Sequence, residues 1–222
     1  MNFMKYPSFN QEKKLWKKGY QYVIGLDEVG RGALAGPVVA AAVMINSQIS
    51  VNRNSRIFAN KLANIREIKD SKQLTPKQRE KFYKILTTHP IISWGIAFVS
   101  EKIIDEINVL EATKIAMINA INDLNLKQNQ KTFLLVDGNF KLNFPISQKS
   151  IVKADEKIFS CTCASVIAKI TRDRIMEKLD KKYPQYGFKK HKGYGTKLHF
   201  SMIKKYGSCK IHRKTFAPIK NF

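Results

Sequence analysis

Residues 22–32 read YVIGLDEVGRG, a stretch that joins an apolar run, two carboxylates and a glycine-rich turn. Its apolar start is typical of a buried strand, and the run ends at two adjacent carboxylates, Asp27 and Glu28. Carboxylates at the carboxyl end of a sheet strand face the crevice in which α/β proteins bind their ligands. A turn with one arginine between two glycines follows at once. The stretch therefore predicts a strand that delivers two acidic groups to a ligand site.

Apolar runs and amphipathic stretches further along the chain predict a mixed α/β sheet with helices on its faces. The run GPVVAAAVMI is apolar enough for a strand that is covered on both sides. Thr75 and Pro76 form a helix-start signal, an N-cap followed by proline at the first helical position. Residues 46–69 show weak periodicity, which predicts a loop with short pieces of structure. Strands are predicted at 22–27, 36–45, 92–100 and 131–137 and before Asp155, and helices from Pro76, over 108–124 and over about 157–182.

The charge of the chain points to its partners. Of 222 residues, 40 are lysine or arginine and 17 are aspartate or glutamate, which gives a formal charge of +23. A charge this large favours a polyanionic partner, and nucleic acid is the first candidate. A general lysine bias would also raise the charge, but it does not explain an acidic cluster inside a basic chain. The length and the 44% hydrophobic content predict one main domain, which we expect to be a monomer.

No segment predicts a membrane span or a targeting signal. The longest apolar stretch, residues 33–45, contains Pro37 and is too short to cross a bilayer. Three cysteines make an odd count without a CxxC pair, which favours a reducing compartment. We therefore expect a cytoplasmic protein without a disulfide framework. The histidines lack partner cysteines at zinc-finger spacing, which disfavours a zinc site.

The aspartates that end predicted strands form a candidate catalytic site. Asp137 shares the context of Asp27, because each ends an apolar strand and is followed by glycine within three residues. Asp155 follows another apolar pair, so folding can bring these carboxylates together with Glu28. Like charges at close range need a cation between them, and Mg²⁺ prefers carboxylate oxygens. Two such ions about 3.5–4 Å apart can activate a water and stabilise the leaving oxygen in phosphodiester cleavage, as in nucleases.

Other interpretations of the same residues stay open at this point. An aspartate at a strand end is often a turn former or a helix cap. Among enzymes, a metal-dependent exonuclease or a transposase-like enzyme fits the same charges. A non-catalytic basic protein that binds nucleic acid would need no metal and no clustered carboxylates.

Six segments, which run in order from about residue 22 to residue 216, resemble ribonuclease HII. They are GLDEVGRGALAGPVVAAAV, DSKQLT (70–75), LLVDGN, SxxxASVIAKITRDR (160–174), HKGYGT (191–196) and HRKTF (212–216). The related type HIII usually carries an extra N-terminal domain and lacks the GRG turn, so the resemblance favours HII. It implies an RNase H-like mixed sheet flanked by helices, with a helical basic C-terminal extension. The implied division is a catalytic domain at 1–182 with a short N-terminal arm and a substrate-binding extension at 183–222.

The resemblance also implies an activity. It implies an endonuclease that cuts the RNA strand of RNA/DNA hybrids and nicks 5′ to single ribonucleotides in duplex DNA, leaving 3′-OH and 5′-phosphate ends. The implied cofactor is Mg²⁺ or Mn²⁺, with a two-metal site when substrate is bound. A general RNase H-like nuclease without junction specificity is the alternative among enzymes.

The family's site residues map onto this chain position by position. Ala154 is a departure, because the family usually has glycine before the last aspartate, and this change could shift the backbone at Asp155. The implied roles are metal binding for Asp27, Glu28, Asp137 and Asp155, ribose reading for Gly30, Arg31 and Gly32, a place at the RNA–DNA junction for Tyr194, and contact with the substrate backbone for Ser71 and Lys72.

Overall fold

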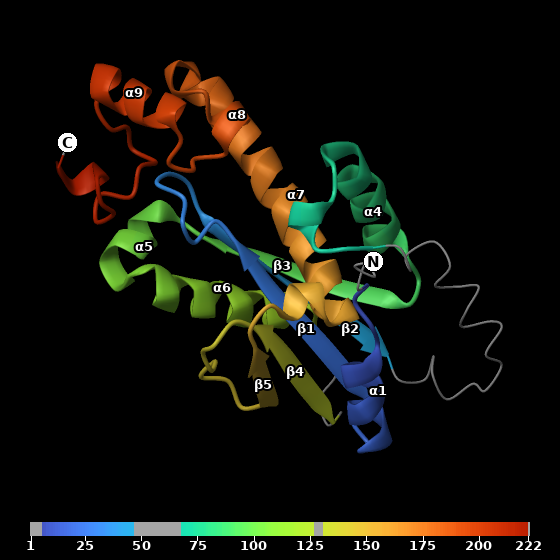
Figure 1. Ribbon diagram of the computed structural model, residues 1–222. Coiled ribbons are helices and arrows are strands. Elements are labelled where there is room, and N and C mark those ends of the chain that lie inside the picture. Colours follow the sequence, from blue (N-terminus) through green and yellow to red (C-terminus); the bar gives the residue numbers. More distant parts are fainter. Residues whose placement is uncertain (1–5, 47–67, 127–130, 222) are drawn as a thin grey trace, which may run out of the picture.

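A computed structural model describes residues 6–46, 68–126 and 131–221 of the chain (Figure 1). Most of the loop predicted at 46–69 lies outside the described residues. Within the described part, no helix combines the length and the apolar character that a membrane crossing requires.

One mixed sheet of five strands, in the order β3-β2-β1-β4-β5, forms the centre of the fold. Strand β1 pairs antiparallel with β2 and parallel with β4, so it is the middle strand. Strand β1 has a paired strand on each edge, and helices cover both of its faces. This burial explains why its sequence is a nearly continuous apolar run. The strands are β1 (Tyr22–Val29), β2 (Val38–Asn46), β3 (Ile92–Val99), β4 (Thr132–Asp137) and β5 (Ser147–Ile151).

Helices cover both faces of the sheet and bury two hydrophobic clusters (Figure 1). On one face lie α5 (Glu101–Ile107) and α6 (Val109–Asp123). Met117 of α6 and Leu26 of β1 belong to the hydrophobic cluster that these helices form with the sheet. On the other face, α4 (Pro76–Thr88) and α7 (Phe159–Lys182) pack against β2 and β3. The predicted sheet with helices on its faces is confirmed, and the helix predicted at about 157–182 begins at Phe159.

Helix ends follow the local sequence closely. Thr75 and Gln78 form a reciprocal capping box at the start of α4, which confirms the predicted helix start. Helix α5 was not predicted, because seven residues carry too little periodicity to stand out from the flanking strand and helix. It is separated from α6 by Asn108, whose positive φ of 70° breaks the helix and whose side chain caps α6.

A glycine in β1 sets how closely α7 approaches the sheet. A Cβ at Gly25 would overlap the backbone of Ser160 and Cys161, in the first turn of α7. The start of α7 therefore lies directly on β1, and it brings the preceding segment with Asp155 to the end of that strand. The short helix α1 (Asn10–Lys17) packs on the same region, because Ser160 donates from its backbone N–H and its hydroxyl to Glu12.

The C-terminal elements form a helical layer on the loop between β1 and β2. Helices α8 (Phe188–His191) and α9 (Lys197–Tyr206) share a hydrophobic cluster with Leu34 and Ala35 of that loop. The helical C-terminal extension is thus confirmed. Its separation at residue 183 as a substrate-binding unit stays a prediction.

Candidate active site

Three carboxylates meet where β1, β4 and the start of α7 converge. Asp27 lies in β1, Asp137 ends β4, and Asp155 lies in the short 3-10 helix η3 (Ala154–Glu156). One carboxylate oxygen from each lies within 4.8 Å of the other two. The sheet explains this convergence, because β1 and β4 are parallel neighbours and their carboxyl ends meet at the same edge.

Burial and mutual repulsion make this centre electrostatically unfavourable on its own. Burial is the largest cause that raises the pKa of Asp27, and the charges of Glu28, Asp137 and Asp155 raise it further. Burial likewise raises the pKa of Glu28 to about 7, although Arg31 partly opposes it. The pKa of Asp137 is also raised, first by burial. A cation placed between these groups would lower all three pKa values.

Glu28 lies beside the three aspartates but turns toward the glycine-flanked arginine. Its Oε1 accepts a hydrogen bond from Arg31 Nη1 at 3.3 Å, while its Oε2 is buried and has no hydrogen-bond partner among the residues that the structure describes. A buried carboxylate oxygen without a partner is unfavourable unless a ligand satisfies it. The structure therefore places the fourth predicted carboxylate next to the cluster with an unsatisfied oxygen.

Asp155 is held by its neighbours despite the alanine that precedes it. The backbone N–H of Ala154 donates to Asp137 Oδ1 at 2.8 Å, and Thr162 donates from its hydroxyl to the Asp155 carbonyl at 2.6 Å. The residue with positive φ in this turn is Lys153, so the alanine needs no glycine-like conformation. Ala154 is therefore compatible with the geometry that brings Asp155 to the site.

The segment before α4 brings a fourth aspartate close to Asp155. Asp70 caps the 3-10 helix η2 (Ser71–Gln73) by accepting from the Lys72 backbone N–H, and its pKa is raised mainly by burial and also by the charge of Asp155. Lys72 Nζ donates to Asp155 Oδ2 at 2.9 Å. The hydroxyl of Ser71 is buried and accepts a bond from Ser165 at 2.7 Å, so it serves to fix this segment to α7.

The two glycines of the GRG turn differ in what the fold requires of them. Gly30 has a φ of +97°, and a Cβ there would overlap the side chain of Arg172. Gly32 is exposed, and a Cβ there would meet no atom of residues 6–46, 68–126 and 131–221 within 4 Å. The chain's own packing explains Gly30, but it gives no reason for Gly32, whose backbone is open to a close approach from outside.

Two fully buried arginines donate hydrogen bonds to carbonyls of this turn and of the segment that follows it. Arg213 donates to the carbonyls of Gly30, Arg31 and Gly36 at 2.7, 2.8 and 3.1 Å. Arg172 donates to the carbonyls of Pro37, Ala35 and Lys192 at 2.9, 3.1 and 2.8 Å. Burial first, and then the charge of Arg172, lowers the pKa of Arg213 to about 9. The two guanidinium groups thus satisfy carbonyls on the buried side of the turn, and these hydrogen bonds fix its shape.

Tyr194 lies against the same turn, although 162 positions separate it from Gly32 in the sequence. It forms a β-bridge with Ala33, and Leu34 donates from its N–H to the carbonyl of Gly193 at 2.8 Å. The guanidinium of Arg172 lies 5.3 Å from the centroid of its ring. The structure therefore brings the predicted ribose-reading turn and the predicted junction tyrosine together.

Sequence reasoning missed Asp70 and Arg213 as members of this site, and it left undecided whether Arg172 faces substrate or Asp173. Asp70 is the first residue of the DSKQLT segment, and it had a local signal in the sequence. An aspartate at this position can cap the turn that contains Lys72. The arginines have no local signal, because a buried arginine that binds distant carbonyls has the same sequence context as an exposed one.

Comparison with known proteins agrees with this geometry. The family described as Ribonuclease HII matches residues 24–219. Ribonuclease HII of Caldicellulosiruptor bescii is 44% identical over 208 residues, which cover 94% of this chain and 92% of that protein. Ribonuclease HII of Chlamydia caviae is 46% identical over 209 residues, which cover 94% of this chain and 90% of that protein.

Solved structures agree as well. The crystal structure of the ribonuclease H2 from Pyrococcus horikoshii is similar with a TM-score of 0.68 and 31% identity, over 90% of this chain and 96% of that one. The structure of Bst-RNase HIII in complex with Mn²⁺, at 18% identity and a TM-score of 0.61 over 90% of this chain and 68% of that one, shares the fold. By sequence and by fold, this chain belongs to the ribonuclease HII family, nucleases with RNase H activity on RNA/DNA hybrids.

Proposed function

We propose that this protein nicks duplex DNA 5′ to single embedded ribonucleotides, in addition to cutting the RNA strand of RNA/DNA hybrids. The products are 3′-OH and 5′-phosphate ends. One observation carries the proposal: the turn that holds the open backbone of Gly32 and pairs with Tyr194 directly follows the strand of Asp27, which meets two further carboxylates within 4.8 Å. Ribose reading and phosphodiester cleavage can therefore take place on adjacent groups of one substrate.

The donor set fits Mg²⁺ or Mn²⁺. All the groups are carboxylates, the ligand type that hard divalent ions prefer, and Glu28 Oε2 is a buried oxygen without a hydrogen-bond partner in the described part of the chain. Asp27, Glu28, Asp137 and Asp155 would hold the ion. When bound, it supplies activation of a water and stabilisation of the leaving oxygen. The family is dependent on divalent metal, which agrees with this donor set.

Discrimination of ribose from deoxyribose is assigned to the GRG turn. The 2′-OH is both a donor and an acceptor, and it is the group by which proteins distinguish RNA from DNA. Arg172 and Arg213 bind carbonyls behind the turn and keep its exposed edge in place. Gly32 lets the 2′-OH approach that edge without meeting a side chain. DNA would leave the polar groups of the turn unpaired, which is unfavourable once water is excluded.

Tyr194 and the C-terminal extension are assigned to the junction. An aromatic ring beside the turn can stack on a sugar or base, and such stacking is tolerant of sequence. Lys72 is exposed over 76% of its side chain and can reach a phosphate near the carboxylates. Arg31 is 40% exposed and is a second such group. These cations position the backbone without reading sequence.

The test uses a DNA duplex with one ribonucleotide, an all-DNA duplex and a long RNA/DNA hybrid, each with Mg²⁺, Mn²⁺ or EDTA. We expect a single nick 5′ to the ribonucleotide with metal, and no cleavage with EDTA. Asp137→Asn should abolish cleavage, whereas the control Glu106→Gln, an exposed acid on α5, should cleave like the wild type. Cleavage of the hybrid alone would leave the carboxylate assignment standing and overturn the junction roles of Gly32 and Tyr194. Tight binding without any cleavage would instead favour a non-catalytic binding protein.

A further inference from the structure

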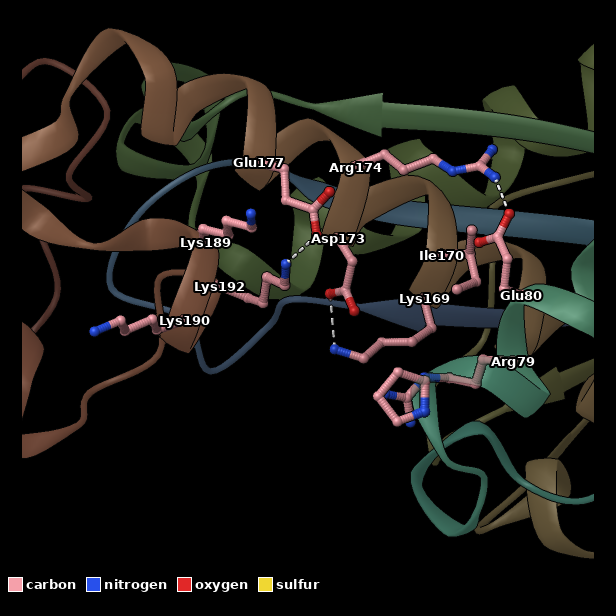
Figure 2. A pocket seen from close by; sticks show the side chains of 11 residues that line it. Arg79, Glu80, Lys169, Ile170, Asp173, Arg174, Glu177, Lys189, Lys190 and Lys192 are labelled. Carbon is pink, nitrogen blue, oxygen red and sulfur yellow. Dashed lines mark hydrogen bonds and ion pairs between the residues drawn. The ribbon is translucent and has the colours of Figure 1, made fainter.

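A charged pocket of about 500 Å³ lies between α4, α7 and α8, on the side of α7 that faces away from the sheet (Figure 2). Six of its lining side chains are basic and three are acidic. Pro76 and Ile170 are its apolar members, whereas pockets for small organic ligands are lined mainly by hydrophobic groups. The lining therefore suits an anion. The basic residues are Arg79, Lys169, Arg174, Lys189, Lys190 and Lys192.

Ion pairs fix three of these cations in position. Lys169 Nζ lies 2.8 Å from Asp173, and Lys192 Nζ lies 2.7 Å from Glu177, and the two lysine side chains are only 19% and 16% exposed. Arg174 is paired with Glu80 at 2.6 Å and lies over the ring of Tyr83. Figure 2 shows Lys169 and Lys192 on the same side of α7, with the carboxylate of Asp173 between them.

Lys169 lies at the floor of the pocket, where its positive charge is poorly solvated. Burial lowers the pKa of Lys169, the bond to Asp173 opposes this effect, and the charges of Arg79 and Arg172 lower the pKa further. A buried ammonium beside two guanidinium groups gains from any anion that enters. Lys189, at the rim, is exposed and adds positive charge above this floor.

One face of α7 connects the pocket to the active-site segment. Ser165, Lys169, Asp173 and Glu177 follow one another at intervals of four residues, so they lie in one row. Ser165 bonds to Ser71 in the active-site segment, and the twelve residues from Ser165 to Glu177 span about 18 Å. A duplex strand carries one phosphate per about 3.4 Å of axis, so this row covers roughly five base pairs.

Hydrogen bonds also connect one end of the pocket to the segment that carries Lys72 and the other end to the region of Tyr194. At one end, Arg79 Nη1 donates to the carbonyls of Ser71 and Leu74 at 2.8 and 2.6 Å. At the other end, the carbonyl of Lys192 accepts from Arg172, which lies under Tyr194. A strand that passes from the carboxylates toward the extension would therefore run along this pocket.

We propose that this pocket is a second phosphate site, which binds backbone phosphates of the nucleic-acid duplex within about five base pairs of the cut. The identity of the ligand rests on the proposed function, because the pocket itself selects only for phosphate. Lys169 and Lys192 bind the phosphate at the floor, and Lys189 binds at the rim. The site adds affinity and positions the duplex, and it takes no part in bond breaking.

The test compares two double variants with the same change in charge. Lys189→Gln with Lys192→Gln removes two cations from the pocket, and Lys204→Gln with Lys205→Gln removes two exposed cations from α9. Binding to a labelled DNA duplex with one ribonucleotide is measured in EDTA, over a range of salt concentrations. We expect the pocket variant to bind roughly tenfold more weakly at moderate salt. The slope of log K against log salt should fall by about 1.8, because each lost phosphate contact removes about 0.9. The control should keep a slope near that of the wild type.

Shortening the duplex on each side of the ribonucleotide provides the second readout. The wild type should lose affinity when one arm becomes shorter than about five base pairs, and the pocket variant should not. Equal losses in the two double variants would mean a general charge effect and would overturn the proposal. Thermal protection of the wild type alone by inorganic phosphate, with equal duplex binding by the two variants, would mean a site for free phosphate and would also overturn it. Because binding is measured without metal, failure of the wild type to nick the duplex would count against the proposed function and leave this comparison intact.

Discussion

The ammonium of Lys72 lies 2.9 Å from Oδ2 of Asp155 and 4.0 Å from Oδ1 of Asp70. Burial lowers the pKa of Lys72, but the bond to Asp155 and the charges of Asp70 and Asp27 raise it more, so the pKa ends above its ordinary value. A lysine thus supplies positive charge to Asp155, one of the carboxylates that are assigned to a divalent ion. The side chain is exposed, so it can leave Asp155 without any rearrangement of the core.

Lys72→Gln should therefore bind Mn²⁺ several-fold more tightly than the wild type, because the ion no longer competes with an ammonium for Asp155. In EDTA the same variant should lose about 1 kcal/mol of unfolding free energy, because the carboxylates lose a counter-charge. Calorimetric titration with Mn²⁺ and urea unfolding measure the two effects. Lys153→Gln is the matched control, since Lys153 lies two positions before Asp155 but pairs with Glu156. Equal Mn²⁺ affinities in all three proteins would show that Lys72 does not compete with metal.

Arg213→Lys should loosen the GRG turn without touching the carboxylates. An ammonium cannot reproduce the fork that reaches the carbonyls of Gly30, Arg31 and Gly36, so at least one buried carbonyl loses its donor. We expect a loss of roughly 2 kcal/mol of unfolding free energy. We also expect a lower ratio of kcat/KM on the single-ribonucleotide duplex to kcat/KM on the long hybrid. Lys214→Gln, at the exposed neighbouring position, should leave both values unchanged. A proportional fall on both substrates would assign Arg213 a purely structural role.

The parts of the fold that sequence could predict are those whose causes are local. Strand β1 is apolar because both of its faces are covered. Helix α4 begins after Thr75 because Thr75 and Gln78, three positions apart, form its capping box. Sequence could predict that Asp27 and Asp137 face a ligand crevice, because each stands at the carboxyl end of an apolar run. That the two strands are parallel neighbours is seen only in the sheet.

The rest depends on contacts between segments that are distant in the chain. Nothing near Arg213 in the sequence indicates that it binds the carbonyl of Gly30, 183 positions away. Gly25 looks like an ordinary strand residue until the first turn of α7 is seen to lie on it. The short helix α5 has too few residues for its periodicity to be recognised. These features are set by packing, which sequence patterns do not record.

Two alanine substitutions in the GRG turn should separate folding from recognition. Gly30→Ala should destabilise the protein by more than 1 kcal/mol, because φ at this position is +97° and the new Cβ would overlap Arg172. Gly32→Ala should leave the unfolding free energy within about 0.5 kcal/mol of the wild type, since a Cβ there meets no atom of the described residues within 4 Å. The same variant should cleave the single-ribonucleotide duplex with a clearly lower kcat/KM, because the Cβ obstructs the approach of the ribose. Unchanged cleavage by Gly32→Ala would remove Gly32 from the recognition surface.

A cluster of buried histidines in the C-terminal extension should make the stability of the protein depend on pH. His199 Nε2 and His212 Nε2 lie 3.0 Å apart, and the ring of His191 stacks on that of His199 at 4.3 Å. Burial is the main cause that lowers the pKa of both His199 and His212 to about 4, and the charge of His191 lowers each further. Protonation of both rings would also bring two N–H donors face to face.

The sign of this dependence follows from the direction of the shift. Because the folded pKa values lie below the ordinary histidine value of about 6.5, the unfolded chain binds more protons between about pH 4 and pH 6.5. The stabilisation is complete above that window and is lost as the pH falls through it, by up to about 1.4 kcal/mol per pH unit for each ring. The buried carboxylates of the active site contribute with the opposite sign, since their pKa values are raised. The difference between the wild type and His199→Gln therefore isolates the histidine part. Urea unfolding at several pH values from 4.5 to about 7.5 should give a flatter curve for the variant, and parallel curves would show that His199 does not exchange a proton on unfolding.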